Sequence, residues 1–489
     1  MQNVYDIPII ARGRIIEPGD DAVEFAGRAG ARFRCPDAGR HLRDLALTDT
    51  DRMRDLQDLP VRSIVDFLAE LGSRLRLADN RYLQEAFELS LLAGGLTEPV
   101  LRSVYESLPE MFDRTYLEET VERTIGSAYL DGWVRQGTHP SEPRIRAVGT
   151  RILHITAGNV PIVGALTIIQ SGLTKGDCLI KLPSNDPLSA TAIARTMIEL
   201  DPDHPLVKHV AVAYWKGGDE AIEAQICRTS RIDKITAWGG MASMKHIQKY
   251  LVPGLDFVAL NPKLSISIVG HEALESPAAM ADAARGIAVQ VGRVNQSACS
   301  NTRVVYVESG TDDASLDRVV ELGRGVCEAL AALPPGLSTP AARPDPELES
   351  ELRALELEEE LFWVQGNSVD GGVIVSRFSD RVDFFDKLNN RIVNLVPLPD
   401  IRQVLRWCDD STQTVGVYPD RLLLELRDRL ALAGAQRIVA LSAVKPLDAG
   451  DRGSFPGMPH DGIEPLRRMV RWVVDESGVT EPALAEAAE

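Results

Sequence analysis

The chain lacks several features that mark specialised classes of protein. It has no excess of basic residues: the formal net charge of −18 argues against a nucleic-acid partner, because phosphate binding needs a basic surface. It shows no signal-peptide pattern and no apolar run of membrane-spanning length. The nearest candidate, residues 155–173, is interrupted by Asn159, Pro161 and Gln170. We therefore expect a cytoplasmic protein with no nucleic-acid partner and no membrane span.

Cysteine is also scarce. No two of the six cysteines have C-x-x-C spacing, and none clusters with histidine as zinc ligands do: Cys35, Cys178, Cys227, Cys299, Cys327 and Cys408. This usage suits a reducing compartment, where thiols are structural or catalytic, and we expect no metal site. The fingerprint G-x-G-x-x-G and the phosphate-binding sequence G-x-x-x-x-G-K-[ST] are absent as well. A standard Rossmann dehydrogenase and a P-loop enzyme are therefore disfavoured.

The 489 residues are too many for one hydrophobic core, so we expect two or three domains. Residues 1–145 have the pattern of a mainly helical region that follows a short leading strand and packs on the next domain. From residue 146 short β-rich runs alternate with helical stretches, which predicts βαβ units and a parallel sheet. We expect one α/β domain over residues 146–270, a second over 271–455 and a C-terminal tail over 456–489.

The same patterns place individual elements. The expected helices are Val61–Leu71, Tyr82–Leu92, Glu118–Trp133, Pro187–Leu200 and Glu220–Arg228. The expected strands are Arg151–Thr156, Asp177–Lys181, Val207–Tyr214, Ile232–Ala237, Leu264–Val269, Arg303–Val307, Gly371–Val375 and Arg437–Leu441. Residues 344–360 carry eight acidic side chains and spaced leucines, which predicts a solvated helix over an insertion or, alternatively, an acidic docking site.

Turns that follow three of these strands carry residues suited to binding. After the strand that ends at Thr156, Asn159 either offers its amide to a developing oxyanion or closes the turn on its own backbone. Lys181 suits a ribose hydroxyl or a phosphate, or it is an ordinary surface lysine. Gly239 and Gly240 either let an anion approach a helix N-terminus or simply form a turn.

Cys299 lies in a different setting from the other cysteines. Small polar residues surround it in Asn295–Ser300, directly before an expected strand. Structural cysteines usually lie inside apolar runs, as Cys178 does. Cys299 therefore has the setting of an accessible thiol, which is a nucleophile if its pKa is lowered and an inert cysteine otherwise.

The order of these elements resembles the aldehyde dehydrogenase superfamily and, more closely, its LuxC-type acyl-CoA reductases. The residues that carry the resemblance are Ile155–Pro161, Ile180–Pro187, Leu260–Lys263, Asn295–Ser300 and Pro459–Gly462. The resemblance implies an α/β, aldehyde dehydrogenase-like fold, with a Rossmann-like cofactor domain, an α/β catalytic domain and an oligomerisation arm. We accordingly expect the nucleotide in residues 146–270, the nucleophile in 271–455, and a homo-oligomer.

The resemblance also assigns roles by position. Cys299 matches the acyl-accepting nucleophile, and Asn159 matches the amide of an oxyanion hole completed by the cysteine's own N–H. The positions that match the cofactor site are Thr156, Lys181, Ser184, Gly239 and Gly240. His460 either protonates a leaving thiol or is structural.

Two departures from the superfamily pattern bear on the reaction. Ser184 stands where many NAD-specific members have a glutamate, and serine can donate to a 2′-phosphate, so we expect NADPH. Ala259 stands where the water-activating glutamate is expected, and no acidic residue occurs between Phe257 and Gly270. Without a general base the acyl-cysteine should resist hydrolysis, which favours reduction over oxidation to an acid.

We therefore expect an NADPH-dependent acyl-thioester reductase that forms an aldehyde. Its donor would be an acyl-CoA or an acyl group on a carrier-protein thiol, and an acyl-activating protein is a possible partner. Two alternatives stay open: a CoA-acylating aldehyde dehydrogenase that runs oxidatively, and a cysteine acyltransferase without redox activity.

Overall fold

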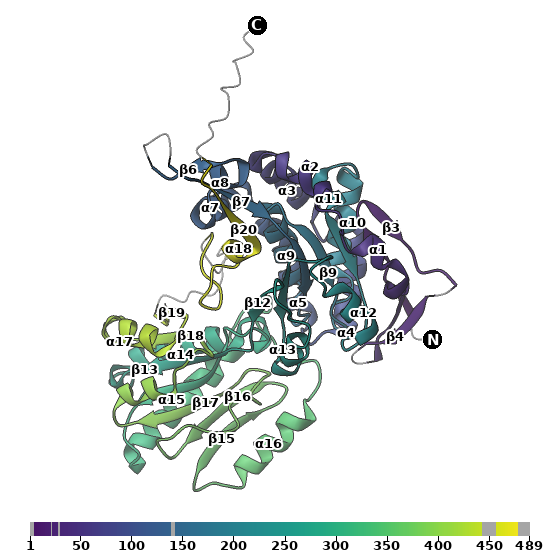
Figure 1. The fold of residues 1–489 in the computed structure, drawn as a ribbon. Helices are drawn as coiled ribbons and strands as arrows, with labels where there is room; N and C mark the ends of the chain where they lie inside the picture. The colour runs from purple at the N-terminus through teal and green to yellow at the C-terminus, as the bar shows by residue number, and fades with distance from the viewer. Residues whose placement is uncertain (1–3, 21, 28–29, 138–141, 443–455, 478–489) are drawn as a thin grey trace.

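The computed structural model describes residues 4–20, 22–27, 30–137, 142–442 and 456–477 (Figure 1). Two lobes, each built on a seven-stranded sheet, make up most of the molecule. In this part of the chain no helix is both long enough and apolar enough to cross a membrane. Residues 162–173 of the candidate span form a twelve-residue helix, α9 (Ile162–Leu173), which packs in the first lobe.

The first lobe contains the sheet with strand order β12-β11-β8-β9-β10-β2-β3. Its parallel strands are β8 (Arg151–Ile155), β9 (Asp177–Lys181), β10 (Val210–Ala213), β11 (Lys234–Trp238) and β12 (Asp256–Leu260). These strands are apolar without alternation because both faces are covered. One face packs on α3 (Val61–Arg74), α4 (Arg81–Ala93), α5 (Glu98–Glu106), α9 and α10 (Ser189–Leu200). The other packs on α1 (Leu42–Leu45), α12 (Glu220–Ile226) and α13 (Met241–Gln248).

The N-terminal region contributes strands that its sequence did not predict. β2 (Ile9–Ala11) pairs antiparallel with β10, and β3 (Arg14–Ile16) pairs with β2, so both belong to the first sheet. β1 (Val4–Asp6), β5 (Arg32–Cys35) and β4 (Val23–Ala26) form a separate three-stranded sheet. Strands of three or four residues are too short to show a period-two pattern, which is why only one leading strand was expected.

Helices occupy the next hundred residues, as expected. The predicted helix over Glu118–Trp133 is interrupted, because Gly126 has a positive φ of 86° and separates α7 (Arg114–Thr124) from α8 (Ser127–Asp131). Other short helical turns are α2 (Arg54–Asp58), α6 (Leu108–Met111) and α11 (Pro205–Lys208).

The second lobe contains the sheet with strand order β15-β16-β17-β14-β13-β18-β19. The strands are β13 (Leu264–Val269), β14 (Thr302–Glu308), β15 (Phe362–Asn367), β16 (Gly371–Ser376), β17 (Ile392–Leu398), β18 (Thr412–Tyr418) and β19 (Arg437–Ala440). All neighbours are parallel except β15 and β16. One face packs on α14 (Pro277–Gly292) and α15 (Asp313–Ala331), and the other on α17 (Asp420–Ala433).

The acidic segment forms α16 (Pro346–Glu356), which confirms a helix there. Its buried leucines, Leu348, Leu352 and Leu355, pack against β15 and β16, while Glu347 and Glu356 are exposed. A docking role for the acidic face stays a prediction.

The link between the two lobes is short. β12 ends at Leu260 and β13 begins at Leu264, so Asn261–Lys263 join the carboxyl end of one sheet directly to the amino end of the other. The expected boundary at residue 270 assigned Leu264–Val269 to the first domain, whereas the structure places this strand inside the second sheet. A buried apolar strand fits either sheet by composition, so its pattern could not assign it.

The C-terminal segment returns to the first lobe. β20 (Val470–Asp475) pairs antiparallel with β7 (Arg144–Gly149), which also pairs with β6 (Val134–Arg135). α18 (Pro465–Met469) precedes β20, and Figure 1 shows both on the side of the first lobe near β7. This three-stranded sheet is separate from the two large sheets. Residues 456–477 are thus more than the tail that was expected, while formation of a homo-oligomer stays a prediction.

Candidate active site

The candidate nucleophile lies where the carboxyl edge of the first sheet faces the amino edge of the second. Cys299 belongs to the loop between α14 and β14. Three consecutive residues before it have left-handed backbone conformations: Val294 at φ 45°, Asn295 at φ 51° and Gln296 at φ 62°. Each such residue costs about 1–3 kcal/mol, so the surrounding structure must hold the loop in place.

Buried amides hold this loop. The Gln296 side chain donates to the Thr302 and Ile392 carbonyls, at 3.0 and 2.8 Å, and accepts from the Ile392 N–H. Asn301 donates to the Gln290 carbonyl in the last turn of α14 and to the Arg293 carbonyl, and it accepts from the Ala298 N–H at 2.9 Å. Gln296 and Asn301 are each 1% exposed, so their hydrogen bonds are fully shielded from water. The position of Cys299 is therefore fixed by the fold.

The Cys299 sulfur is half-buried and faces several polar groups. The Gln413 Nε2 lies 3.0 Å from Sγ, and the backbone N–H groups of Cys299 and Ser300 also interact with it. Burial raises the pKa of the Cys299 thiol, and the negative charge of Asp461 raises it further. The hydrogen bonds lower the pKa but only in part, so the thiol form is favoured in this state.

The structure brings Asn159 to the same loop. Asn159 follows β8, and its Nδ2 donates to the Ser297 carbonyl at 2.6 Å, two residues before Cys299. An asparagine amide has two N–H donors, so one remains for a ligand. The position expected for an oxyanion donor is thus occupied by an amide beside the candidate nucleophile.

The candidate cofactor residues lie along the carboxyl edge of the first sheet. Ile155 pairs with Lys181, and Ala237 pairs with Ile155, so the three strands end level. The Thr156 hydroxyl donates to the Lys181 carbonyl at 3.0 Å and ties two strand ends together. The half-buried Ser184 hydroxyl makes no hydrogen bond within the described ranges and is available to a ligand.

Lys181 and the glycine turn fit a dinucleotide. Burial lowers the pKa of Lys181 to about 8, although Glu223 offsets part of this effect, and the Nζ makes no hydrogen bond to any described side chain or carbonyl. Gly240 precedes α13, and a Cβ there would meet nothing within 4 Å. Packing within the protein therefore does not require a glycine here. A pyrophosphate bound at the free N–H groups of the helix would require one, because it would lie close to the backbone.

Comparison with known proteins identifies the family and the fold of this chain. The sequence model of the family described as acyl-CoA reductase (LuxC) matches residues 56–472. The chain belongs to this family. The long-chain acyl-protein thioester reductase of Aliivibrio fischeri is 28% identical over 88% of this chain and 85% of its own length. That of Photorhabdus laumondii is 30% identical over 74% of this chain and 70% of its own length.

Solved structures show the same fold. The NADP-dependent glyceraldehyde-3-phosphate dehydrogenase of Bacillus halodurans, complexed with NADP, covers 96% of this chain with a TM-score of 0.68 at 14% identity, and the chain covers 99% of it. The 1-pyrroline-5-carboxylate dehydrogenase of Thermus, with bound NAD, covers 97% with a TM-score of 0.69 at 14% identity, and 93% of it is covered. The predicted aldehyde dehydrogenase-like fold is confirmed, and neighbours of this fold bind NAD or NADP.

Family membership also confirms the predicted reaction. This LuxC-family chain is an oxidoreductase that reduces an acyl thioester to an aldehyde. The individual site residues stay predictions, although the structure places Cys299 and Asn159 at one loop and the candidate cofactor residues along the sheet edge beside it.

Sequence reasoning missed two residues of this LuxC-family site. Gln413, near the amino end of β18, contacts the sulfur, and its Nε2 also lies 2.5 Å from Oδ1 of Asp461. No pattern singles out Gln413, because β18 was not predicted. Asp461 lies in Pro459–Gly462, where the sequence singles out only His460 as a candidate. An isolated antiparallel β-bridge pairs His460 with Ile463 and closes a tight turn. Asp461 lies in this turn and contacts Gln413.

These contacts modify the inference drawn from Ala259. Ala259 lies in β12, where it pairs with Ala237, and its side chain offers no carboxylate. A carboxylate nevertheless lies close to the candidate nucleophile, because Asp461 arrives from the C-terminal segment with a side chain that is only 4% exposed. The Gln413 Nε2 contacts both Asp461 and the sulfur, and the negative charge of Asp461 also raises the pKa of Cys299.

His460 lies beside the same turn. Its Nε2 is 3.6 Å from Oδ1 of Asp461, and its ring packs at 5.1 Å from that of Trp238, at the end of β11. Burial lowers the pKa of His460, although Asp461 offsets part of this effect. His460 thus contacts the edge that carries the cofactor residues, and its role in proton transfer stays a prediction.

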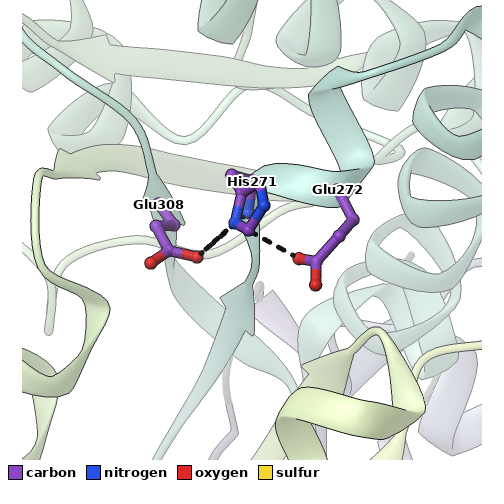
Figure 2. Close-up of side chains that lie close together, drawn as sticks. All are labelled: His271, Glu272 and Glu308. Carbon is purple, nitrogen blue, oxygen red and sulfur yellow. Dashed lines mark hydrogen bonds and ion pairs between the residues drawn. The ribbon is translucent and has the colours of Figure 1, made fainter.

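A second group of titratable side chains lies at the carboxyl edge of the second lobe's sheet, opposite the edge at which Cys299 lies. Figure 2 shows His271 between Glu272 and Glu308, and its Nδ1 is 3.0 Å from Oε2 of Glu308. The hydrogen bond to Glu308 raises the pKa of His271, and Glu272 also pairs with Arg421. The group follows the carboxyl ends of β13 and β14, whereas Cys299 precedes the amino end of β14. It is therefore not part of the active site.

Proposed function

We propose that this chain reduces a long-chain acyl thioester carried on a protein, through an acyl-Cys299 intermediate, with NADPH as the hydride donor. The observation that carries the proposal is the rigid loop that holds the Cys299 sulfur against its own N–H and that of Ser300, beside the Asn159 amide. A thioester carbonyl at the sulfur would meet donors for its oxyanion.

The expected steps balance without a general base. The Cys299 thiolate attacks the thioester carbonyl, and the Asn159 amide and backbone N–H groups stabilise the oxyanion. The proton that Cys299 loses before the attack passes to water, and the donor's thiolate leaves and takes up a proton from water. Bound NADPH supplies a hydride. The resulting oxyanion on the Cys299-linked carbon again faces Asn159, and it collapses to the aldehyde as the C–S electrons return to Sγ.

Two observations support the finer parts of the proposal. Relatives from Aliivibrio fischeri, Vibrio harveyi and Photorhabdus luminescens are named long-chain acyl-protein thioester reductases, which favours a protein-bound donor. The Ser184 hydroxyl is available at the expected ribose position, and a hydroxyl can donate to the 2′-phosphate of NADPH. Lys181 and the N-terminus of α13 would hold the ribose and the pyrophosphate.

Intact-protein mass spectrometry tests the reaction directly. The enzyme is mixed with a panel of acyl-CoAs and acyl-carrier-protein thioesters, and NADPH is then added. We expect an acyl adduct in the wild type and in Cys327→Ala, a matched control at another half-buried cysteine, but none in Cys299→Ala. The adduct should disappear as aldehyde on adding NADPH. An adduct that persists in Cys299→Ala would refute the proposed nucleophile, and one formed only from acyl-CoA would refute the protein donor.

A further inference from the structure

The strands on both sides of β13 carry an extra residue at the end nearest Cys299. On one side Ser265 pairs with Thr302 but Ile266 pairs with Val304, so Arg303 is extra. On the other side two steps along β13 correspond to three along β18, between Thr412 and Val415. Such bulges bend a strand and redirect its side chains. Gln413 lies within the second of these irregularities.

Ser265 connects the bulge of β18 to the nucleophile's loop. Its hydroxyl donates to the Cys299 carbonyl at 2.8 Å and accepts from the Thr414 N–H at 3.1 Å. The Ser265 hydroxyl therefore hydrogen-bonds both to the backbone of Cys299 and to the backbone next to Gln413. The side chain of Gln413, 6% exposed, then reaches the sulfur.

The contact with Asp461 determines which end of the Gln413 amide faces the sulfur. An amide group has N–H donors at one end and an acceptor oxygen at the other, whereas an ionised carboxylate only accepts. The Nε2 lies 2.5 Å from the Asp461 Oδ1 and 3.0 Å from the Cys299 Sγ, so each of its two hydrogens has an acceptor. The opposite orientation would place Oε1 against the carboxylate and is disfavoured.

We propose that Gln413 is a catalytic residue, which donates an N–H to the Cys299 sulfur whenever that sulfur carries negative charge, and that Asp461 is a positioning residue, which fixes the Gln413 amide in that orientation. The inference rests on Cys299 being the nucleophile. The hydrogen bond would stabilise the attacking thiolate and, later, the thiolate released when the aldehyde departs. It would weaken in the acyl-enzyme, where the sulfur is neutral.

The charged and polar groups around the sulfur come from three parts of the chain. Asp461, from the C-terminal segment, disfavours the thiolate, and His460 lies next to it. Arg303, from β14, interacts electrostatically with Cys299 and with Asp386, and favours the thiolate. Gln413, from β18, adds a neutral donor. Removing Gln413 should therefore shift the thiol's titration upward with every other group unchanged.

The pH dependence of Cys299 alkylation by iodoacetamide, followed by peptide mass spectrometry, tests the proposal. Gln413→Met keeps the length of the side chain and removes its N–H donors. We expect the midpoint of the profile to rise by about one pH unit, the value of a hydrogen bond to a charged group. Gln403→Ala, at a glutamine in the 3-10 helix Ile401–Trp407, should leave the profile unchanged.

The role of Asp461 is tested by repeating the substitution in an Asp461→Ala background. If Asp461 fixes the amide, Gln413→Met should shift the midpoint much less there than in the wild type. An equal shift in both backgrounds would refute the positioning role, and no shift in the wild type would refute the donor role. The alkylation profile of Cys327 in the same digest reports whether each variant is folded. If Gln413→Met is unfolded, Gln413→Glu replaces it, and we expect this variant to raise the midpoint further.

Alkylation needs neither acyl donor nor cofactor. A failure of the proposed donor or of NADPH specificity would leave this result unaffected, and loss of the acyl adduct in Cys299→Ala remains the separate test of the proposed function.

Discussion

At the scale of single residues, Asn159 is the simplest test of the oxyanion site. Its side chain is exposed and its hydrogen bond goes to the Ser297 carbonyl. Asn159→Ala should lower kcat by a factor of about 10²–10³, the usual loss for one oxyanion donor. Thermal unfolding should change little, since an exposed substitution rarely matters to stability. Steady-state NADPH oxidation and calorimetry measure the two effects, and near-normal turnover would contradict the role.

Ser184 gives a second prediction at this scale. Ser184→Glu would place a carboxylate where a 2′-phosphate is expected, and like charges in one site repel. We expect kcat/KM to fall at least about tenfold with NADPH while NADH is little affected, because a tenfold change corresponds to about 1.4 kcal/mol. Ser350→Glu, on the exposed side of α16, is the matched control. A wild type that uses NADH equally well would refute the NADPH preference.

Single residues also show where sequence reasoning stops. Asn159 and Lys181 could be selected because they lie just after and at the end of predictable strands, and parallel strands bring such positions to one edge. Cys299 could be selected because small polar residues surround it. Gln413 could not, since a bulge decides where it points and bulges leave no signature in this sequence. Asp461 contacts Gln413 from the C-terminal segment, and no local pattern predicts that this segment returns to pair β20 with β7, more than three hundred residues away along the chain.

At the scale of elements, the left-handed turn before Cys299 depends on Gln296. Gln296→Ala would leave the Thr302 and Ile392 carbonyls without their side-chain donor, whereas the Ile392 N–H keeps its bond to the Asn389 carbonyl. We expect a loss of about 2–4 kcal/mol in the free energy of unfolding, since each unsatisfied buried group costs about 1–3 kcal/mol. Acyl-adduct formation should slow as well. Urea denaturation of this variant beside Gln403→Ala measures the difference, and equal stability would contradict the role of Gln296.

Elements differ in how well their sequences predict them. The expected strands Asp177–Lys181 and Leu264–Val269 have the observed bounds, because each is an uninterrupted β-rich run. β17 and β18 were not predicted. Both are buried on each face and so lack period-two alternation, and β17 also contains Asn394 and Pro397. Without β18 the neighbour of Cys299 could not be identified.

At the scale of the whole molecule, a buried ionic network joins the N-terminal segment to the first sheet. Asp177, at the start of β9, pairs with Arg12 and accepts from His209, while the other His209 nitrogen faces Asp55. Burial would lower the pKa of His209, but its bonds to Asp177 and Asp55 prevail and raise it above 6.5. Burial would likewise raise the pKa of Asp177, but His209 and Arg12 lower it.

These shifts predict how stability depends on pH. A raised pKa for His209 contributes stability that is complete below about pH 6.5 and is lost as the pH rises through its folded value. His209→Gln should therefore lower Tm most near pH 6, with the difference shrinking towards pH 8.5. Scanning calorimetry of the wild type and His209→Gln across that pH range measures the difference in Tm. His41→Gln, at a histidine that pairs with Asp44 outside this network, is the control. A difference independent of pH would mean that the pKa of His209 is the same in the folded and unfolded protein, and would contradict the prediction.

The return of the chain to the first lobe has a consequence for biosynthesis. The five parallel strands of the first sheet have all been synthesised at Leu260. β7, however, gains its partner β20 only after the entire second lobe has been translated. Ribosomes add about 5–20 residues per second, and N-terminal domains generally fold first. A nascent chain that has already made Cys299 still lacks Asp461, so the thiol and its surroundings become a complete site only late in synthesis. Acylation during translation would therefore meet a thiol that has not yet acquired its final environment.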